Sequence, residues 1–294
     1  MNPIRTEATT PLAPSVQNVR RVIRLVTGRR DGPINRLVSP SDIGQLIKPF
    51  VFLDYAEVPP SEAMFGIHPH SGIATLTVVL SGEMVYEDTT GKSGQVSAGG
   101  LEWMQAGGGV WHDGHPTGRD PLKLYQLWLA LPAAQENAPA ESQYIAPQDV
   151  QHEGPARVVL GQLGSAASPI RSPAGINYLH VTLKNGQHWR YKPPAGHTVA
   201  WTAVYEGALR TPDSVPAGAL AVFNESDAAI DFVANGDTSF VLGSAIKHPH
   251  DLVMGYYSVH TNAAALERGE AEIRRIGDRL RASGGCNSRR ASNP

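Results

Sequence analysis

Between residues 66 and 116 the chain alternates between apolar and polar side chains in short runs that glycine-containing turns separate. Apolar residues recur at alternating positions over 73–80, the turn Ser81-Gly82 follows, and a second run extends from Glu83 to Asp88 before the glycines of 90–94. A period of two is typical of strands with one buried face, and short turns between such runs indicate hairpins. The stretch therefore predicts antiparallel strands of the kind that close into a small barrel.

Histidines are concentrated in the same stretch. His68 and His70 stand two residues apart, so in a strand both imidazoles project from one face and can reach one metal ion. A strand, a glycine-rich bend and a further strand over 99–112 bring His112 back beside this pair, and His115 follows three residues later. Four of the chain's 11 histidines lie here, and a cluster with this spacing predicts a metal site.

The composition narrows the class of protein. The 25 Lys and Arg residues against 27 Asp and Glu give no basic excess for direct nucleic-acid binding. Cys286 is the single cysteine, which excludes an intrachain disulfide and cysteine ligation of a metal, and a reducing cytoplasm is the expected compartment. No apolar run has the length of a signal peptide or a membrane span, so we expect no membrane partner. The 41% hydrophobic content, 30 glycines and 23 prolines fit one large or two smaller all-β domains.

The strand pattern of the first half recurs in the second half. Trp201 to Gly207 corresponds to Leu76 to Gly82, each strand ending at a turn glycine, and 216–220 echoes 97–101. Two related barrels are therefore predicted. The expected units are a disordered tail (1–15), a first barrel domain (16–131), an Ala-, Gln- and Pro-rich linker (132–147), a second barrel domain (148–262), a helix (263–282) and a disordered tail (283–294).

The second half carries histidines without the paired arrangement. His180, His188 and His197 form no H-x-H, so we expect its barrel to be metal-free. His248-Pro249-His250 has no matching later histidine cluster, and we interpret it as a plain loop. Asn262 is a suitable N-cap, and the apolar residues at helical spacing after it predict a helix that packs on a barrel.

Four stretches of the chain match one known pattern. The pattern H-P-H is matched by His68-Pro69-His70, and WM-AG-G-x-x-H is matched by the stretch from Trp103 to His112. A P-F-x-x-L-D strand is matched by 49–54, and a closing strand is matched by 124–129. In these motifs the chain resembles the pirin family of the cupin superfamily. The resemblance implies an all-β bicupin, two cupin-type antiparallel β-barrels, in which His68, His70 and His112 bind one first-row transition metal, with Fe(II) the expected ion.

Both carboxylates of that family's site are missing here. The family's glutamate two residues after the third histidine corresponds to Gly114, and its motif acid four residues after the second histidine corresponds to Ala74. Three neutral imidazoles leave more of the ion's charge unneutralised, which affects affinity and redox potential. Strand alternation turns His115 away from His112, but a bulge at Gly114 would re-aim either neighbour, so Asp113 and His115 are candidate substitute ligands.

Three functions are consistent with these residues. Some pirins resemble quercetin 2,3-dioxygenases in activity, which implies an iron dioxygenase acting on a flavonol-like or other small aromatic substrate. Its general base would come from Asp113, His115 or Glu102, and Trp103 and Trp111 are candidates for the pocket wall or for simple packing. Other pirins resemble redox-responsive regulators, which implies a metal-dependent binding protein with a protein partner. The third hypothesis is a degenerate barrel that keeps the histidines without the metal.

Overall fold

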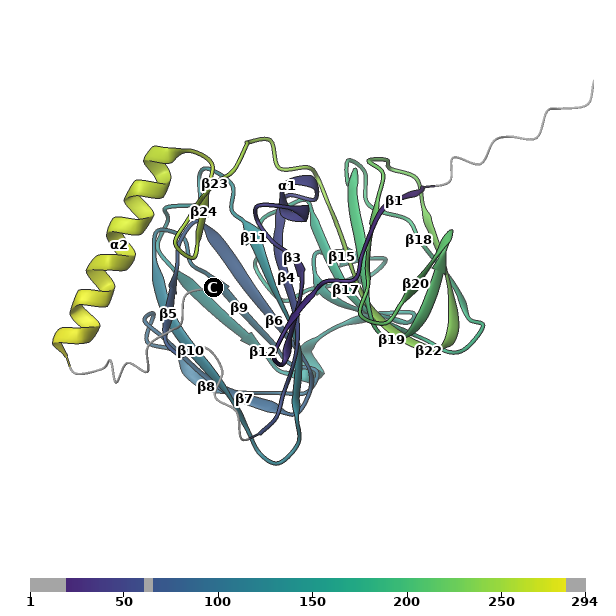
Figure 1. Ribbon diagram of the computed structural model, residues 1–294, viewed down its shortest axis with the longest axis horizontal. Helices are drawn as coiled ribbons and strands as arrows, with labels where there is room; N and C mark the ends of the chain where they lie inside the picture. The colour runs from purple at the N-terminus through teal and green to yellow at the C-terminus, as the bar shows by residue number, and fades with distance from the viewer. Residues whose placement is uncertain (1–19, 61–65, 284–294) are drawn as a thin grey trace, which may run out of the picture.

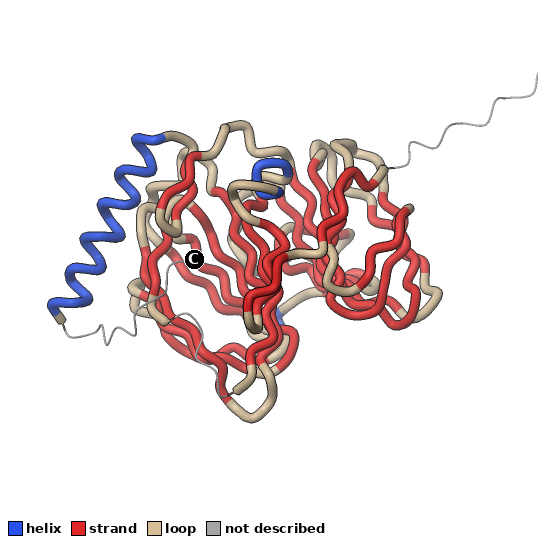
Figure 2. Tube along the Cα trace, in the orientation of Figure 1, coloured by secondary structure: helices blue, strands red, loops and turns tan. Residues whose placement is uncertain are grey.

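The computed structural model describes residues 20–60 and 66–283 and shows two antiparallel β-barrels side by side, with a long helix along the outer side of the first barrel (Figure 1). Strands make up most of the described chain (Figure 2). The prediction of two cupin-type barrels with a C-terminal helix is confirmed. The predicted tail 1–15 and, apart from Ser283, the predicted tail 283–294 lie outside the described residues.

The first barrel consists of two sheets with a cavity between them. Seven strands form the larger sheet in the order β12-β9-β6-β11-β4-β3-β2, and four form the smaller sheet in the order β5-β10-β7-β8. The larger sheet contains β2 (Arg29–Asp31), β3 (Ile34–Val38), β4 (Phe50–Val58), β6 (Ile73–Ser81), β9 (Leu101–Gln105), β11 (Leu122–Ala130) and β12 (Glu141–Ile145). The smaller sheet contains β5 (His68–His70), β7 (Glu83–Asp88), β8 (Ser93–Ser97) and β10 (Val110–Thr117).

The second barrel is built from one nine-stranded sheet in the order β1-β21-β19-β22-β17-β14-β13, with β18 paired to β22 and β20 paired to β19. Its strands are β1 (Val22–Val26), β13 (His152–Glu153), β14 (Ala156–Leu160), β17 (Ile176–Leu183), β18 (His188–Tyr191), β19 (Val199–Thr211), β20 (Asp213–Pro216), β21 (Leu220–Phe223) and β22 (Ile230–Ala245). The remaining elements are α1 (Ile43–Leu46), η1 (Pro147–Asp149), β15 (Gln162–Leu163), β16 (Ala166–Ala167), β23 (Val253–Gly255), β24 (Ser258–His260) and α2 (Ala263–Ala282).

The larger sheet of the first barrel is buried on both faces. Leu76, Trp103 and Leu127 belong to one apolar cluster with Tyr178 and Trp201 of the second barrel, so this face forms the contact between the barrels. Because successive residues of a strand point to opposite faces, their neighbours point into the first barrel. Polar residues at those neighbouring positions mark the cavity described below.

Each barrel is completed by a segment from the opposite end of the chain. β1 pairs with β21 of the second barrel, and Arg20 donates from Nε to the Asn224 carbonyl at 3.1 Å. The start of the predicted first domain, 16–131, therefore belongs in part to the second barrel. The hairpin β23–β24 and helix α2 lie instead against the first barrel (Figure 1). Local sequence pattern could not reveal this exchange, because it depends on pairing across the whole chain.

The predicted linker 132–147 contains a strand. β12 pairs with β9 along the edge of the larger sheet, from Glu141 opposite Gln105 to Ile145 opposite Leu101. This edge strand has the sequence ESQYI and alternates neither in polarity nor in burial, so the apolar periodicity that predicts the other strands is absent from it. The connection between the barrels is correspondingly shorter than predicted.

Helix α2 begins directly after the predicted N-cap. The Asn262 side chain accepts a hydrogen bond from the Ala265 backbone N–H at 2.9 Å, as a capping residue does. Ala265, Ile273 and Ile276 are buried, and the Ile273 carbonyl accepts from the Trp111 indole nitrogen at 2.8 Å. Neither α-helix of the described chain has the length and hydropathy that a membrane span requires.

Candidate metal centre

Three histidine side chains converge inside the first barrel. β5 carries His68 and His70, and β10 carries His112, which pairs directly with His68 across the antiparallel ladder. One ring nitrogen of each residue lies within 4.8 Å of the corresponding nitrogens of the other two. The Nε2 atoms of His68 and His112 are 3.0 Å apart.

Backbone carbonyls fix the orientation of two of these rings. His68 Nδ1 lies 2.8 Å from the Gly66 carbonyl, and His70 Nδ1 lies 3.1 Å from the Tyr257 carbonyl. A carbonyl oxygen can only accept, so each Nδ1 carries the proton and each Nε2 presents its lone pair. Burial, with the neighbouring His112, lowers the pKa of His68 to about 3, and burial with His68 and His112 holds the pKa of His70 well below its usual value. Both rings are neutral near pH 7, which is the form that binds metals.

The spacing of two of these nitrogens matches that of ligands on one first-row metal ion. Bonds of about 2.1 Å at angles between 90° and 109° place ligand nitrogens about 3.0 to 3.4 Å apart, and the spacing of His68 and His112 Nε2 is 3.0 Å. Imidazole nitrogens suit Zn, Cu, Fe and Ni rather than Mg or Ca. His68, His70 and His112 would therefore hold such an ion through neutral donors.

The strand after His112 brings no further ligand to this point. β10 pairs with β7 from His112 to Thr117 without a register shift, so no bulge interrupts the alternation. His115 is exposed, and Asp113 Oδ1 accepts from the Gly114 backbone N–H at 2.8 Å. Gly114 itself lines the cavity, and a Cβ atom there would lie 2.7 Å from the flexible methyl end of Met84. The structure thus separates Asp113 and His115 from the three histidines and places a glycine where a carboxylate would reach them.

Glu102 is the candidate that lies beside the histidines. Its side chain on β9 is 3% exposed, and Oε1 is 3.8 Å from His112 Nδ1. Thr77 Oγ1 donates to the other oxygen, Oε2, at 2.8 Å. Trp103 is the next residue and therefore faces the contact between the barrels, while Trp111 packs against α2. These two tryptophans, both predicted as pocket candidates, lie away from the histidines.

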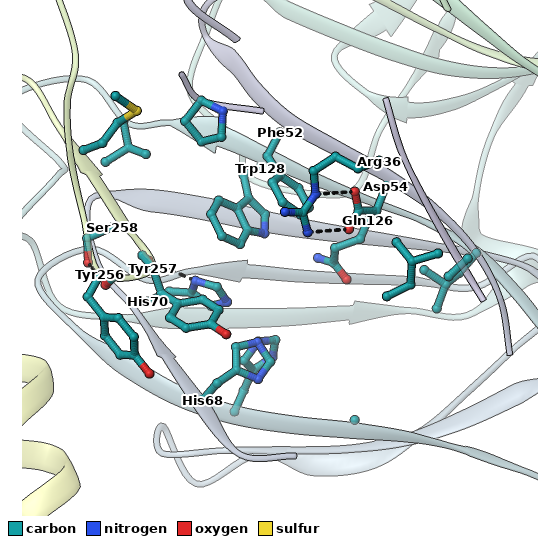
Figure 3. A pocket seen from close by; sticks show the side chains of 18 of the residues that line it. Arg36, Phe52, Asp54, His68, His70, Gln126, Trp128, Tyr256, Tyr257 and Ser258 are labelled. Atoms are coloured by element: carbon teal, nitrogen blue, oxygen red, sulfur yellow. Dashed lines mark hydrogen bonds and ion pairs between the residues drawn. The ribbon is translucent and has the colours of Figure 1, made fainter. Parts of the chain in front are cut away.

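A cavity of about 320 Å³ extends from the histidines between the two sheets. One wall is a continuous row: His70 contacts the Trp128 ring edge-on at 4.8 Å, Trp128 stacks on Phe52 at 4.1 Å, and the Arg36 guanidinium lies 4.4 Å from the Phe52 ring centre. Arg36 forms two hydrogen bonds of 3.0 Å with Asp54 (Figure 3). An aromatic wall with a few polar groups is typical of small-molecule sites.

Several of these cavity residues were missed from the sequence. Asp54 and Gln126 are polar residues inside two apolar strands, directly opposite each other across β4 and β11, and that polarity was the available signal. Tyr257 gave no such signal, because it lies almost 190 residues from His70 in the chain.

The hairpin β23–β24 is fastened beside the histidines by buried polar contacts. Its turn residue Tyr257 has φ of 52°, which is uncommon for a residue with a side chain. Ser71, next to His70, lies 2.8 Å from Ser258 Oγ and 3.0 Å from His260 Nε2, and His260 Nδ1 lies 3.2 Å from Glu136. These contacts hold the Tyr257 carbonyl where His70 needs it.

Three histidines of the second barrel have other partners. His180 Nε2 lies 2.8 Å from the Tyr205 hydroxyl, His188 pairs with Asp231, and His197 Nδ1 lies 3.0 Å from Ser244 Oγ. His248 and His250 lie outside the strands. Within residues 20–60 and 66–283, the group of three metal-binding side chains that the structure brings together is His68, His70 and His112.

The fold and these histidines define a cupin-type barrel protein with a candidate metal centre, and comparison with known proteins gives the family. Residues 33–129 match the Pirin family model. The chain is 30% identical over 243 residues to a Pseudomonas aeruginosa protein described as "Putative quercetin 2,3-dioxygenase", covering 76% of this chain and 84% of that one. A "Pirin-like protein" of Caulobacter vibrioides is 29% identical over 249 residues, covering 79% and 90%. The chain belongs to the pirin family.

Solved structures share the fold. A quercetin 2,3-dioxygenase from Acinetobacter baumannii superposes with a TM-score of 0.80 at 24% identity, covering 88% of this chain and 98% of that one. The Escherichia coli pirin YhhW, solved in complex with nickel(II), superposes with a TM-score of 0.60 at 19% identity, covering 76% and 99%. The family and the histidine cluster together support a metal-binding, pirin-like cupin.

Proposed function

We propose that this chain is a mononuclear Fe(II) dioxygenase of the quercetin 2,3-dioxygenase type, acting on a flavonol-like or other small aromatic substrate. The observation that carries the proposal is the convergence of three imidazoles at one end of an aromatic-walled cavity of about 320 Å³. That volume falls at the small end of the range for ligand pockets. Relatives described as quercetin dioxygenases support the same reaction class.

The chain's own residues would bind and orient the substrate. Phe52 and Trp128 line the cavity with aromatic surface, against which an aromatic substrate would pack. Arg36, Asp54 and Gln126 form the polar end of the same cavity and suit oxygen atoms on the substrate. A ferrous ion on the three histidines would supply the redox and Lewis-acid chemistry that reaction with dioxygen needs.

Proton removal from a substrate hydroxyl needs a base inside the cavity. Of Asp113, His115 and Glu102, the residue that lines the cavity is Glu102. Its two oxygens, however, face Thr77 Oγ1 and His112 Nδ1, so Glu102 is not placed to take a proton from a bound substrate. We therefore assign the general base to none of the three residues.

A second candidate function follows from Gly114. Without the family's glutamate, the metal site is more open on the side of Gly114 and has no charged ligand. Such a site suits a non-enzymatic, redox-responsive protein that binds a protein partner. In that case the cavity would hold metal and show no turnover. A degenerate barrel would show neither metal nor turnover.

Turnover of a flavonol separates these functions. Iron-loaded protein under air would be mixed with quercetin, and loss of the substrate's near-ultraviolet band would be followed in wild type and in Gly114→Glu. We expect turnover by the wild type. Turnover only in Gly114→Glu would mean that the natural chain lacks the reaction and keeps the scaffold, and no turnover in either would favour the binding function.

A further inference from the structure

A row of polar side chains crosses the larger sheet of the first barrel and ends at His112. Adjacent strands pair Arg36 with Asp54, Asp54 with Gln126, Gln126 with Thr77, and Thr77 with Glu102. All five side chains point to the cavity side of a sheet whose other face is apolar, and we call them the polar row. Arg36 and Glu102 lie in one line across the sheet because each residue of the row pairs directly with the next one on the neighbouring strand.

The contacts along the polar row hold Glu102 in one orientation. Arg36 pairs with Asp54 through two hydrogen bonds, and Thr77 Oγ1 lies 2.9 Å from Gln126 Oε1 and 2.8 Å from Glu102 Oε2. The Thr77 hydroxyl has one proton, and a carboxylate is the stronger acceptor. Thr77 therefore donates to Glu102, and a half-turn of the Gln126 amide, which exchanges its oxygen and nitrogen, lets Gln126 donate to Thr77.

The oxygen of Glu102 that Thr77 does not contact, Oε1, lies on the Nδ1 side of the His112 ring. Glu102 Oε1 is 3.8 Å from His112 Nδ1, while His112 Nε2 points the other way, toward His68. A ring shift of about 1 Å would bring Nδ1–H within hydrogen-bond distance of the carboxylate. A metal ion on Nε2 makes the Nδ1–H a stronger donor, and carboxylates in this position orient metal-binding histidines and raise their basicity.

We propose that Glu102 is a positioning residue for His112, and that it supplies from behind this ligand the negative charge that Gly114 does not supply at the metal. This inference rests on the proposed function, because it requires a metal at the three histidines. A buried carboxylate with one protein hydrogen bond needs a further donor, and His112 is the one beside it. In this arrangement the carboxylate of the centre lies on β9 and not on β10.

The test is the affinity of metal-free, full-length protein for Ni(II), measured by calorimetry. Glu102→Gln keeps the size of the side chain and removes its charge, and we expect it to weaken Ni(II) binding about ten- to hundredfold. Glu57→Gln is the matched control, because it removes an exposed carboxylate of the same sheet, and it should leave the affinity unchanged. An unchanged affinity in Glu102→Gln would overturn the inference and leave the metal site standing.

Rescue and spectroscopy distinguish positioning from a merely structural role. Adding Gly114→Glu to Glu102→Gln should restore most of the lost affinity, since a carboxylate returns to the centre by the other route. The visible absorption bands of bound Co(II) should shift in Glu102→Gln, because they report the geometry and basicity of the ligands. Failure of both the rescue and the spectral shift would overturn the inference.

A second variant covers the case in which Glu102→Gln does not fold. Thr77→Val removes the hydrogen bond that orients Glu102 and keeps the shape of the side chain, and we expect about fivefold weaker Ni(II) binding. Wild-type affinity in Thr77→Val would count against the polar row. A wild-type protein that takes up neither Ni(II) nor Fe(II) would overturn the proposed function and this inference with it.

Discussion

The two barrels share a strand pattern but differ in what fills their interiors. In the second barrel Trp189, Phe223, Phe232 and Phe240 pack against one another, with Phe232 and Phe240 ring centres 5.3 Å apart. In the first barrel imidazoles and polar groups take interior positions, and a cavity of about 320 Å³ is left. The comparison shows that a site arises here where imidazoles and polar groups, rather than mutually packed aromatic rings, take interior positions of the same architecture.

Buried histidines behave differently in the two barrels as well. Burial, with Arg157 and His152, lowers the pKa of His180 to about 4, and its Nε2 meets the Tyr205 hydroxyl. His68 and His70 instead use Nδ1 on backbone carbonyls, so their Nε2 atoms point to a shared centre. Burial alone therefore does not make a histidine a metal ligand. The hydrogen-bond partner of one ring nitrogen determines whether the other nitrogen points to a shared centre.

The largest expected effect concerns the filled barrel. Phe232→Ala removes a fully buried ring and should lower the free energy of unfolding by about 3–5 kcal/mol, because the closely packed interior leaves a void. Urea unfolding measures this change. Ni(II) affinity of the protein that remains folded should match the wild type, and a parallel loss of affinity would show that the barrels are coupled.

Removal of a ligand should act on the first barrel alone. His112→Ala should weaken Ni(II) binding at least about a hundredfold, since it removes a metal–nitrogen bond together with the group that Glu102 faces. Metal content of protein purified without chelators, with calorimetry, gives the measurement. The control is His188→Ala in the second barrel, where the side chain is exposed and pairs with Asp231; equal losses in both variants would contradict the assigned centre.

Acid should destabilise the metal-free protein through its buried histidines. An unfolded histidine binds a proton near pH 6.5, whereas the pKa of folded His68 is lowered to about 3 by burial. The unfolded state thus binds more protons in this window, so the stability is complete above about pH 6.5 and is lost as the pH falls toward 3. At pH 5 the loss from His68 is about 2 kcal/mol.

Unfolding at pH 7.5 and at pH 5 measures this dependence. His68→Gln should show less of it, and His180→Gln should show less of it too, because desolvation lowers the pKa of both side chains. Added Ni(II) should restore stability at pH 5 in His180→Gln and not in His68→Gln. The same pH dependence in wild type and His68→Gln would refute the prediction.

The smallest expected effect is a gain at the first barrel. Gly114→Glu should tighten Fe(II) binding about tenfold, because a charged oxygen joins three neutral imidazoles, and the displaced Met84 methyl is flexible. Anaerobic titration measures the affinity. His115→Ala is the companion variant and should leave metal content unchanged, since His115 is exposed; a loss comparable to His112→Ala would make it a ligand.

The sequence predicted those parts of the protein that depend on local spacing. The period of two in 73–88, the pair His68 and His70, and the cap Asn262 with its helix each involve residues a few positions apart, and a strand or a helix turn fixes their relative directions. The two barrels followed from repetition of that local pattern. The matched motifs also implied His112 as a partner of the first pair.

Only the tertiary structure decided which strands become neighbours. It placed β1 in the second barrel and the Tyr257 carbonyl on His70, and it turned Glu102 rather than Trp103 toward His112. In each case the sequence predicted a strand but indicated neither which strand pairs with it nor which of its faces points into the barrel. Pairing between strands distant in the chain is selected by the burial of whole faces, a property of the assembled barrel that no short stretch of residues contains.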